Sequence, residues 1–147
     1  MRLIARMEQE LTAAMRARDS ERRDALRLIL SSLRSAEKEL LRPLHEGEEL
    51  QVLQRERKKR QEAAEAYRAA GRDEQAAAEE AELAVLGEFM PEPLSDEELE
   101  TIIDDAIAEN GATSMRDLGR VMADVIPQVA GRADGGAVSQ LVREKLA

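Results

Sequence analysis

The chain contains no cysteine and no tryptophan, and Tyr67 and Phe89 are its only aromatic residues. The lack of cysteine excludes disulfides, thiolate metal sites and cysteine nucleophiles. The scarcity of aromatics leaves little for stacking on nucleobases, so any contact with nucleic acid is expected at its phosphates. No stretch approaches the roughly 18 apolar residues of a membrane span, and the charged start is not typical of a signal peptide. These absences predict a soluble, cytoplasmic protein.

The remaining composition favours helices throughout. The 147 residues are rich in Ala, Leu, Glu and Arg, and apolar residues recur at helical spacing with no alternating stretch that would indicate a strand. Pro91 and Pro93 interrupt this pattern and favour a domain boundary. We therefore predict an all-α protein, with an N-terminal helical hairpin or bundle over residues 1–90. A small three-helix C-terminal domain is expected over residues 94–147.

The second part carries clear helix-start signals. Ser95 and Glu98 have the spacing of a capping box, in which each side chain pairs with the backbone N–H of the other. Ser114 and Asp117 have the same spacing and predict the start of the next helix. Pro127 is expected to lie just beyond the end of that helix.

Charge is distributed in blocks. The net charge is −9, yet residues 73–100 hold eleven acidic residues and no basic one. Between Leu53 and Ala63 there is no apolar residue, and basic residues surround the helix that this segment is expected to form. One interpretation is a solvated helix with internal ion pairs such as Glu56 with Arg60. The other is a polyanion-binding surface, for which we select these residues: Arg57, Lys58, Lys59 and Arg60.

The stretch "GRADGG", residues 131–136, has two interpretations. Glycines at a helix N-terminus can bind a phosphate. Asp134, however, lies where the N-cap of the last helix is expected, and its carboxylate would occupy the same backbone N–H groups. Capping is the favoured interpretation. Arg132, just outside the cap, would remain free to contact phosphate.

Catalytic constellations are not evident. The sequence has no P-loop, dinucleotide fingerprint or nucleophile elbow. The single histidine, His45, is expected to be a solvated loop residue, and Asp104 and Asp105 point in different directions on one helix. We predict no catalytic residue, no metal site and no cofactor.

Residues 114–142, "SMRDLGRVMADVIPQVAGRADGGAVSQLV", resemble the GatB/YqeY family. This family includes the small YqeY-type proteins and the tail of the B subunit of tRNA-dependent amidotransferase. Two segments match its pattern: "DLGRVM", with Asp117 and Gly119, and "GRAD", with Gly131 and Asp134. Upstream, "KKRQEAAEAYRAAGRDE" and "LGEFMPEPLSDEEL" look like the free-standing YqeY-type arrangement, so that the resemblance covers nearly the whole chain.

The resemblance implies a helical protein of translation that is associated with tRNA. By position in the motif, it brings Arg116, Arg120 and Arg132 near tRNA, whereas Gly119 would let its helix approach a neighbour closely. The implied partners are tRNA itself or a tRNA-handling enzyme of the amidotransferase or glutaminyl-tRNA synthetase type, with no DNA and no membrane. Family association with a glutamine-dependent carbon–nitrogen ligase would describe a complex, because nothing in this chain supplies its chemistry.

Three hypotheses follow. The first is a non-catalytic tRNA-binding or accessory protein. The second is a component of a glutamine-dependent carbon–nitrogen ligase with tRNA amidotransferase activity. The third is a helical protein-interaction module that makes no RNA contact and docks a basic partner through the acidic block.

Overall fold

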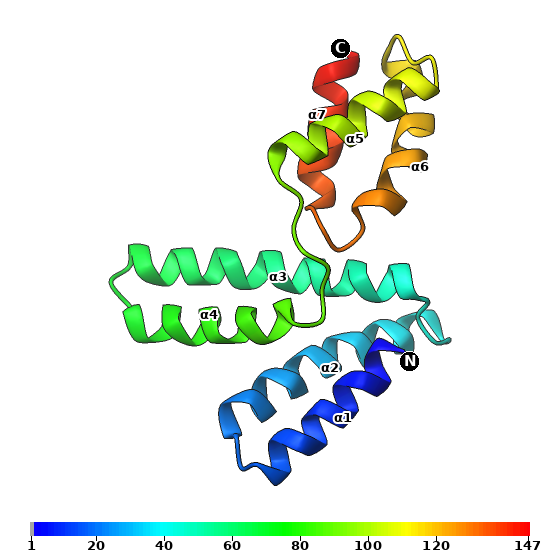
Figure 1. Cartoon of the computed structure of the whole chain (residues 1–147). Helices are drawn as coiled ribbons and strands as arrows, with labels where there is room; N and C mark the ends of the chain where they lie inside the picture. Colours follow the sequence, from blue (N-terminus) through cyan, green and yellow to red (C-terminus); the bar gives the residue numbers. More distant parts are fainter. Residues whose placement is uncertain (1) are drawn as a thin grey trace. The chain divides into compact units, whose positions relative to one another are not determined.

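The structure is a computed structural model that describes residues 2–147. Across these residues it contains seven α-helices, one 3-10 helix and no strand, which confirms the all-α prediction (Figure 1). The elements are α1 (Leu3–Arg16), α2 (Ser20–Leu40), α3 (Glu46–Ala69), α4 (Asp73–Gly87), α5 (Asp96–Glu109), η1 (Met115–Asp117), α6 (Leu118–Val129) and α7 (Gly135–Leu146). Packing divides the chain into two units, one ending at Met90 and the other comprising Pro91–Ala147. The independent domains 1–90 and 94–147 stay a prediction.

The first unit consists of two helical hairpins. Helix α1 packs on α2, α3 packs on α4, and α2 also contacts both α3 and α4. Figure 1 shows α3 and α4 side by side, joined by a short turn. The turn contains Gly71 in the left-handed region, with a φ of 73°. Aliphatic side chains fill the core, and those that are almost completely buried are Met7, Leu26, Leu30, Leu33, Leu53 and Leu86.

Two helices of the first unit begin after a residue whose side chain accepts a hydrogen bond from an otherwise unpaired N–H group of the first turn. Asp19 caps α2 by accepting from Arg22 N. His45 caps α3: its Nδ1 accepts from Glu48 N, while the Glu48 carboxylate accepts from His45 N. The expectation that His45 is a solvated loop residue is confirmed, since it lies just before α3 and 70% of its side chain is exposed. Its imidazole additionally takes the place that Ser or Thr has in most capping boxes.

Helix α1 obtains its cap from another helix. Its own N-cap residue, Arg2, provides no side-chain hydrogen bond. Instead Glu49, from the first turn of α3, accepts from Ile4 N at 3.3 Å. Its side chain is among the least exposed polar groups, at 3%. Burial raises the pKa of Glu49, although the hydrogen bond from Ile4 and the charge of Arg2 oppose that rise.

The second unit is built from α5, α6 and α7 around a separate aliphatic core. Ile103, Val121, Val125, Val138 and Val142 are almost completely buried there. The predicted capping box at the start of α5 is present, with Glu98 N donating to Ser95 Oγ and Ser95 N donating to the Glu98 carboxylate. Within the described part of the chain, no helix combines the length and apolar content that crossing a bilayer requires.

Pro127 lies inside α6, so the prediction that it follows the helix is wrong. Proline removes one backbone donor and therefore one helical hydrogen bond. The helix nevertheless continues to Val129, which is 3% exposed and packs in the core of the second unit. Pro127 lies only two residues before the end of the helix, and the burial of Val129 outweighs the hydrogen bond that the proline removes.

Candidate nucleic-acid interface

Helix α3 carries the cationic segment that sequence analysis selected. Arg55, Lys58 and Lys59 are exposed, whereas Arg57 and Arg60 are partly buried. Burial lowers the pKa of the Arg57 guanidinium, and no carboxylate contributes to that shift. Arginine stays protonated in proteins, so Arg57 adds a fixed positive charge. Arg55, Arg57, Lys58 and Lys59 therefore form a cationic surface, which we call the α3 basic segment.

Arg60 has a different environment from its neighbours. Its guanidinium lies 3.6 Å from Glu56, 3.2 Å from Glu79 and 2.8 Å from Glu82. Glu79 and Glu82 belong to α4, so this cluster holds the second hairpin together. Ser32 Oγ of α2 also donates to Glu56 at 2.8 Å. The predicted pairing of Glu56 with Arg60 is confirmed, and we leave Arg60 out of any RNA-contacting set.

The acidic block, residues 73–100, is engaged in similar internal pairs. Glu80 makes a two-point pair with Arg68 across the α3–α4 turn, and Glu88 lies 2.6 Å from Arg22 of α2. Arg68 holds the pKa of Glu80 below its ordinary value. These contacts show why opposite charges occupy successive segments: α3 and α4 are antiparallel neighbours, so a basic helix faces an acidic one. Fewer carboxylates are then left for a basic partner.

In the second unit, Asp117 organises the turn before α6. Its Oδ2 accepts from Thr113 N at 2.9 Å and from Ser114 N at 3.3 Å, and its Oδ1 accepts from the Arg120 guanidinium. The hydrogen bond from Thr113 and the pair with Arg120 lower the pKa of Asp117. Arg120 remains mostly exposed despite this pair, with 61% of its side chain accessible. Arg116 is exposed as well.

Arg132 connects the loop before α7 to the segment that leads into α5. Its Nε donates to Glu92 O at 3.1 Å, its guanidinium lies 3.9 Å from Glu98, and its carbonyl accepts from Leu94 N at 2.9 Å. The chain can reverse here because Gly131 has a φ of 72°, a region that glycine adopts without strain. The Arg132 side chain therefore has partners within the unit instead of being free, although 35% of it is exposed, and its contact with phosphate stays a prediction.

A model of the family described as Yqey-like protein matches residues 4–146. The chain belongs to this family. The match covers nearly the whole sequence, including both the α3 basic segment and the motif around Asp117. No curated protein matches the chain.

Two residues of the motif in this YqeY-like chain, Gly119 and Asp134, differ from the roles predicted for them. Within residues 2–147, a Cβ at Gly119 would meet no atom within 4 Å, so the predicted close approach of helices is wrong. Gly119 is the second residue of α6 and is exposed. Asp134 does occupy the N-cap position of α7 with extended backbone, but its side chain makes no capping hydrogen bond. Instead its Oδ2 lies over the first turn, 3.6 Å from where a Gly136 Cβ would stand.

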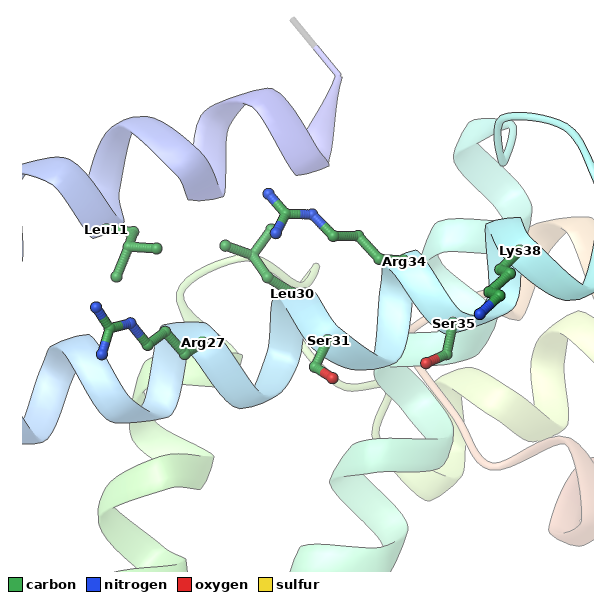
Figure 2. A pocket seen from close by; sticks show the side chains of 7 residues that line it. All are labelled: Leu11, Arg27, Leu30, Ser31, Arg34, Ser35 and Lys38. Atoms are coloured by element: carbon green, nitrogen blue, oxygen red, sulfur yellow. The ribbon is translucent and has the colours of Figure 1, made fainter.

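One further surface of the YqeY-like chain is not evident from the sequence. A cavity of about 290 Å³ lies along the α1–α2 hairpin and is lined by basic, hydroxyl and aliphatic side chains (Figure 2). Arg27, Ser31, Arg34 and Lys38 of α2 line it at steps of three or four residues, which place them on one side of the helix. That spacing was the available signal. It was obscured because apolar and hydroxyl residues separate Arg27 from Arg34 in the sequence, so that no run of basic residues marks the helix.

No group of three or more His, Asp or Glu residues in the described part of the YqeY-like chain has an arrangement that could hold a metal ion. The candidate interface consists of cationic surfaces: the α3 basic segment and the α1–α2 cavity in the first unit, and Arg116 with Arg120 in the second.

We expect Asp117→Ala to lower the thermal midpoint of the second unit by a few degrees, because the variant leaves two turn N–H groups without an acceptor. Amide exchange at Thr113 and Ser114 should accelerate locally. The pKa of Asp117 is lowered in the fold, so its contribution is present above the unfolded pKa of about 3.8. It is lost as the pH falls through the lower folded value. Unchanged exchange at Thr113 would contradict this role.

Proposed function

We propose that this YqeY-like protein is a non-catalytic RNA-binding protein of the cytoplasm that binds tRNA, alone or beside a tRNA-handling enzyme. The observation that carries the proposal is the α3 basic segment. Arg55 and Lys59 are exposed, and neither has a hydrogen bond or ion pair within residues 2–147. Arg60 and Arg68 of α3, by contrast, pair with carboxylates of α4. Cations left uncompensated in a chain of net charge −9 favour an anionic ligand.

The nature of the surface supports phosphate contact. Lysine and arginine that neutralise RNA phosphates release counterions, which supplies much of the affinity of sequence-independent binding. The α3 basic segment is helical and carries no aromatic residue on which a base could stack. Arg116 and Arg120 add two exposed guanidinium groups in the second unit, where arginine can pair with phosphate at two points.

The proposal is tested by fluorescence anisotropy with labelled mixed tRNA over a series of salt concentrations. The wild type should bind at low salt, with an affinity that falls as salt rises. The double variant Arg55→Gln, Lys59→Gln should bind about ten-fold more weakly or worse. Its salt dependence should be shallower by about two phosphate contacts.

A matched control removes exposed cations elsewhere. In the double variant Arg72→Gln, Arg143→Gln, both side chains are exposed and neither has an ion pair within residues 2–147. This variant should keep most of the affinity. Equal losses in both variants would reduce the effect to net charge and overturn the α3 surface. A wild type that binds no tRNA at low salt would overturn the proposed function and favour the protein-interaction module.

A further inference from the structure

The cavity on the α1–α2 hairpin combines cationic and hydroxyl groups with aliphatic side chains. Arg27, Arg34 and Lys38 line it together with two serines, and no carboxylate lines it. Its floor is aliphatic: Leu30 is almost completely buried and Leu11 is partly buried. In Figure 2, Leu11 of α1 faces Leu30 of α2, and the side chains of Arg27 and Arg34 flank this pair.

The polar groups of the cavity are largely unused by the fold. Within residues 2–147, Lys38 and the hydroxyls of Ser31 and Ser35 have no partner, and Arg27 has only a 4.0 Å contact with Met15 Sδ. Ser32, on the neighbouring side of the same helix, instead donates to Leu28 O and to Glu56. Hydroxyl and cationic groups are therefore left available on the cavity side of α2.

Carboxylates near the cavity compensate only part of this charge. Glu8 of α1 lies 2.6 Å from Arg34, and both side chains are about half exposed. Asp24 pairs with Arg23 and also feels the charge of Arg27. Glu37 pairs with Arg2 at 2.8 Å and also interacts through its charge with Arg34 of the lining. An exposed pair such as Glu8 with Arg34 is weak, so a ligand anion can replace the Glu8 carboxylate on Arg34.

We infer that this cavity binds a nucleoside phosphate. Arg27 and Arg34 would pair with the phosphate, the serine hydroxyls would bond to phosphate or ribose oxygens, and the apolar side of the ligand would lie on Leu11 and Leu30. The cavity, about 290 Å³, has the size of the smaller ligand sites of proteins. It accommodates one nucleotide rather than a duplex. The ligand is either a free nucleotide or a nucleotide within a single RNA strand, since both present the same chemistry.

This inference concerns a surface other than the α3 basic segment and stands whether or not tRNA is bound there. The experiment is a titration of the ¹⁵N-labelled full chain, observed by NMR, with adenosine 5′-monophosphate, adenosine and a 12-residue oligoadenylate. The amides of Ser31, Arg34 and Ser35 should shift with a phosphate-bearing probe and stay unshifted with adenosine. Shifts with the monophosphate identify a free nucleotide as ligand, and shifts with the oligonucleotide alone identify a strand.

Two variants test the mechanism. The double variant Arg27→Gln, Lys38→Gln removes no ion pair of the fold and should weaken binding at least ten-fold. Glu8→Gln releases Arg34 and should strengthen binding two- to five-fold. The double variant Arg72→Gln, Arg143→Gln, with the same loss of charge, should bind as the wild type does. The inference is overturned if neither phosphate-bearing probe shifts these amides, or if the Arg27→Gln, Lys38→Gln variant binds unchanged.

Discussion

Arg60→Ala is expected to lower the free energy of unfolding of the first unit by about 2–4 kcal/mol, because it leaves three carboxylates clustered without their cation. The side chains of Arg60 and Glu79 are only 18% exposed, and those of Glu56 and Glu82 are 17% and 26% exposed. Removal of one partner from so dehydrated a cluster costs more than loss of a surface pair.

The measurement is urea denaturation followed by the fluorescence of Tyr67. This is the only tyrosine, it lies in α3, and the chain has no tryptophan, so the signal reports on the first unit alone. Arg68→Ala is the matched control, since Arg68 also joins α3 to α4 through Glu80 but both side chains are about half exposed. We expect a much smaller loss for Arg68→Ala. Equal losses would contradict the special role of the cluster around Arg60.

The loss in Arg60→Ala should depend on pH. Burial raises the pKa of Glu82 above its ordinary value even with Arg60 present, and Arg60 opposes that rise. Without Arg60 the folded pKa is expected to rise further, while the unfolded value stays near 4.5. A raised folded pKa of an acid destabilises the fold above that pKa and has no such effect below the unfolded pKa. The difference between variant and wild type should therefore be largest near pH 7 and shrink toward pH 4.

The second large effect is expected at Glu49. Glu49→Leu should lower the free energy of unfolding by about 2–3 kcal/mol, since it removes the acceptor for Ile4 N and leaves that donor buried. Glu49→Gln keeps an acceptor of the same shape and should stay within about 1 kcal/mol of the wild type. Tyr67 fluorescence again provides the measurement. Similar losses in the two variants would contradict the capping of α1 by α3.

The pH dependence of Glu49→Gln follows from the same reasoning. Burial raises the pKa of Glu49 above 4.5, so the ionised carboxylate carries a desolvation cost at neutral pH that the neutral amide lacks. Relative to the wild type, the glutamine variant should therefore be most favourable near pH 7. This advantage should disappear as the pH falls below the unfolded pKa.

Arg60 also shows why the site could be predicted only in part. Its position in a run of basic residues is evident from the sequence, and its pairing with Glu56 follows from helical spacing alone. Its additional partners, Glu79 and Glu82, lie about twenty residues away and meet it only because α3 and α4 are antiparallel. The same packing gives Arg60 carboxylate partners that Arg55 and Lys59 lack. From the sequence alone, the three residues could not be distinguished.

The sequence by itself determined the local structure of this protein. Apolar spacing and helix-start residues such as Ser95 with Glu98 act within a few residues, so the all-α class and most helix starts could be derived from them. Membership of the YqeY-like family was likewise evident from the motif around Asp117. Tertiary structure alone decided which charges remain available. It placed Glu49 at the start of α1, engaged Arg132 with Glu92, and left Arg27 and Lys38 beside a cavity, because these outcomes depend on contacts between residues far apart in the chain.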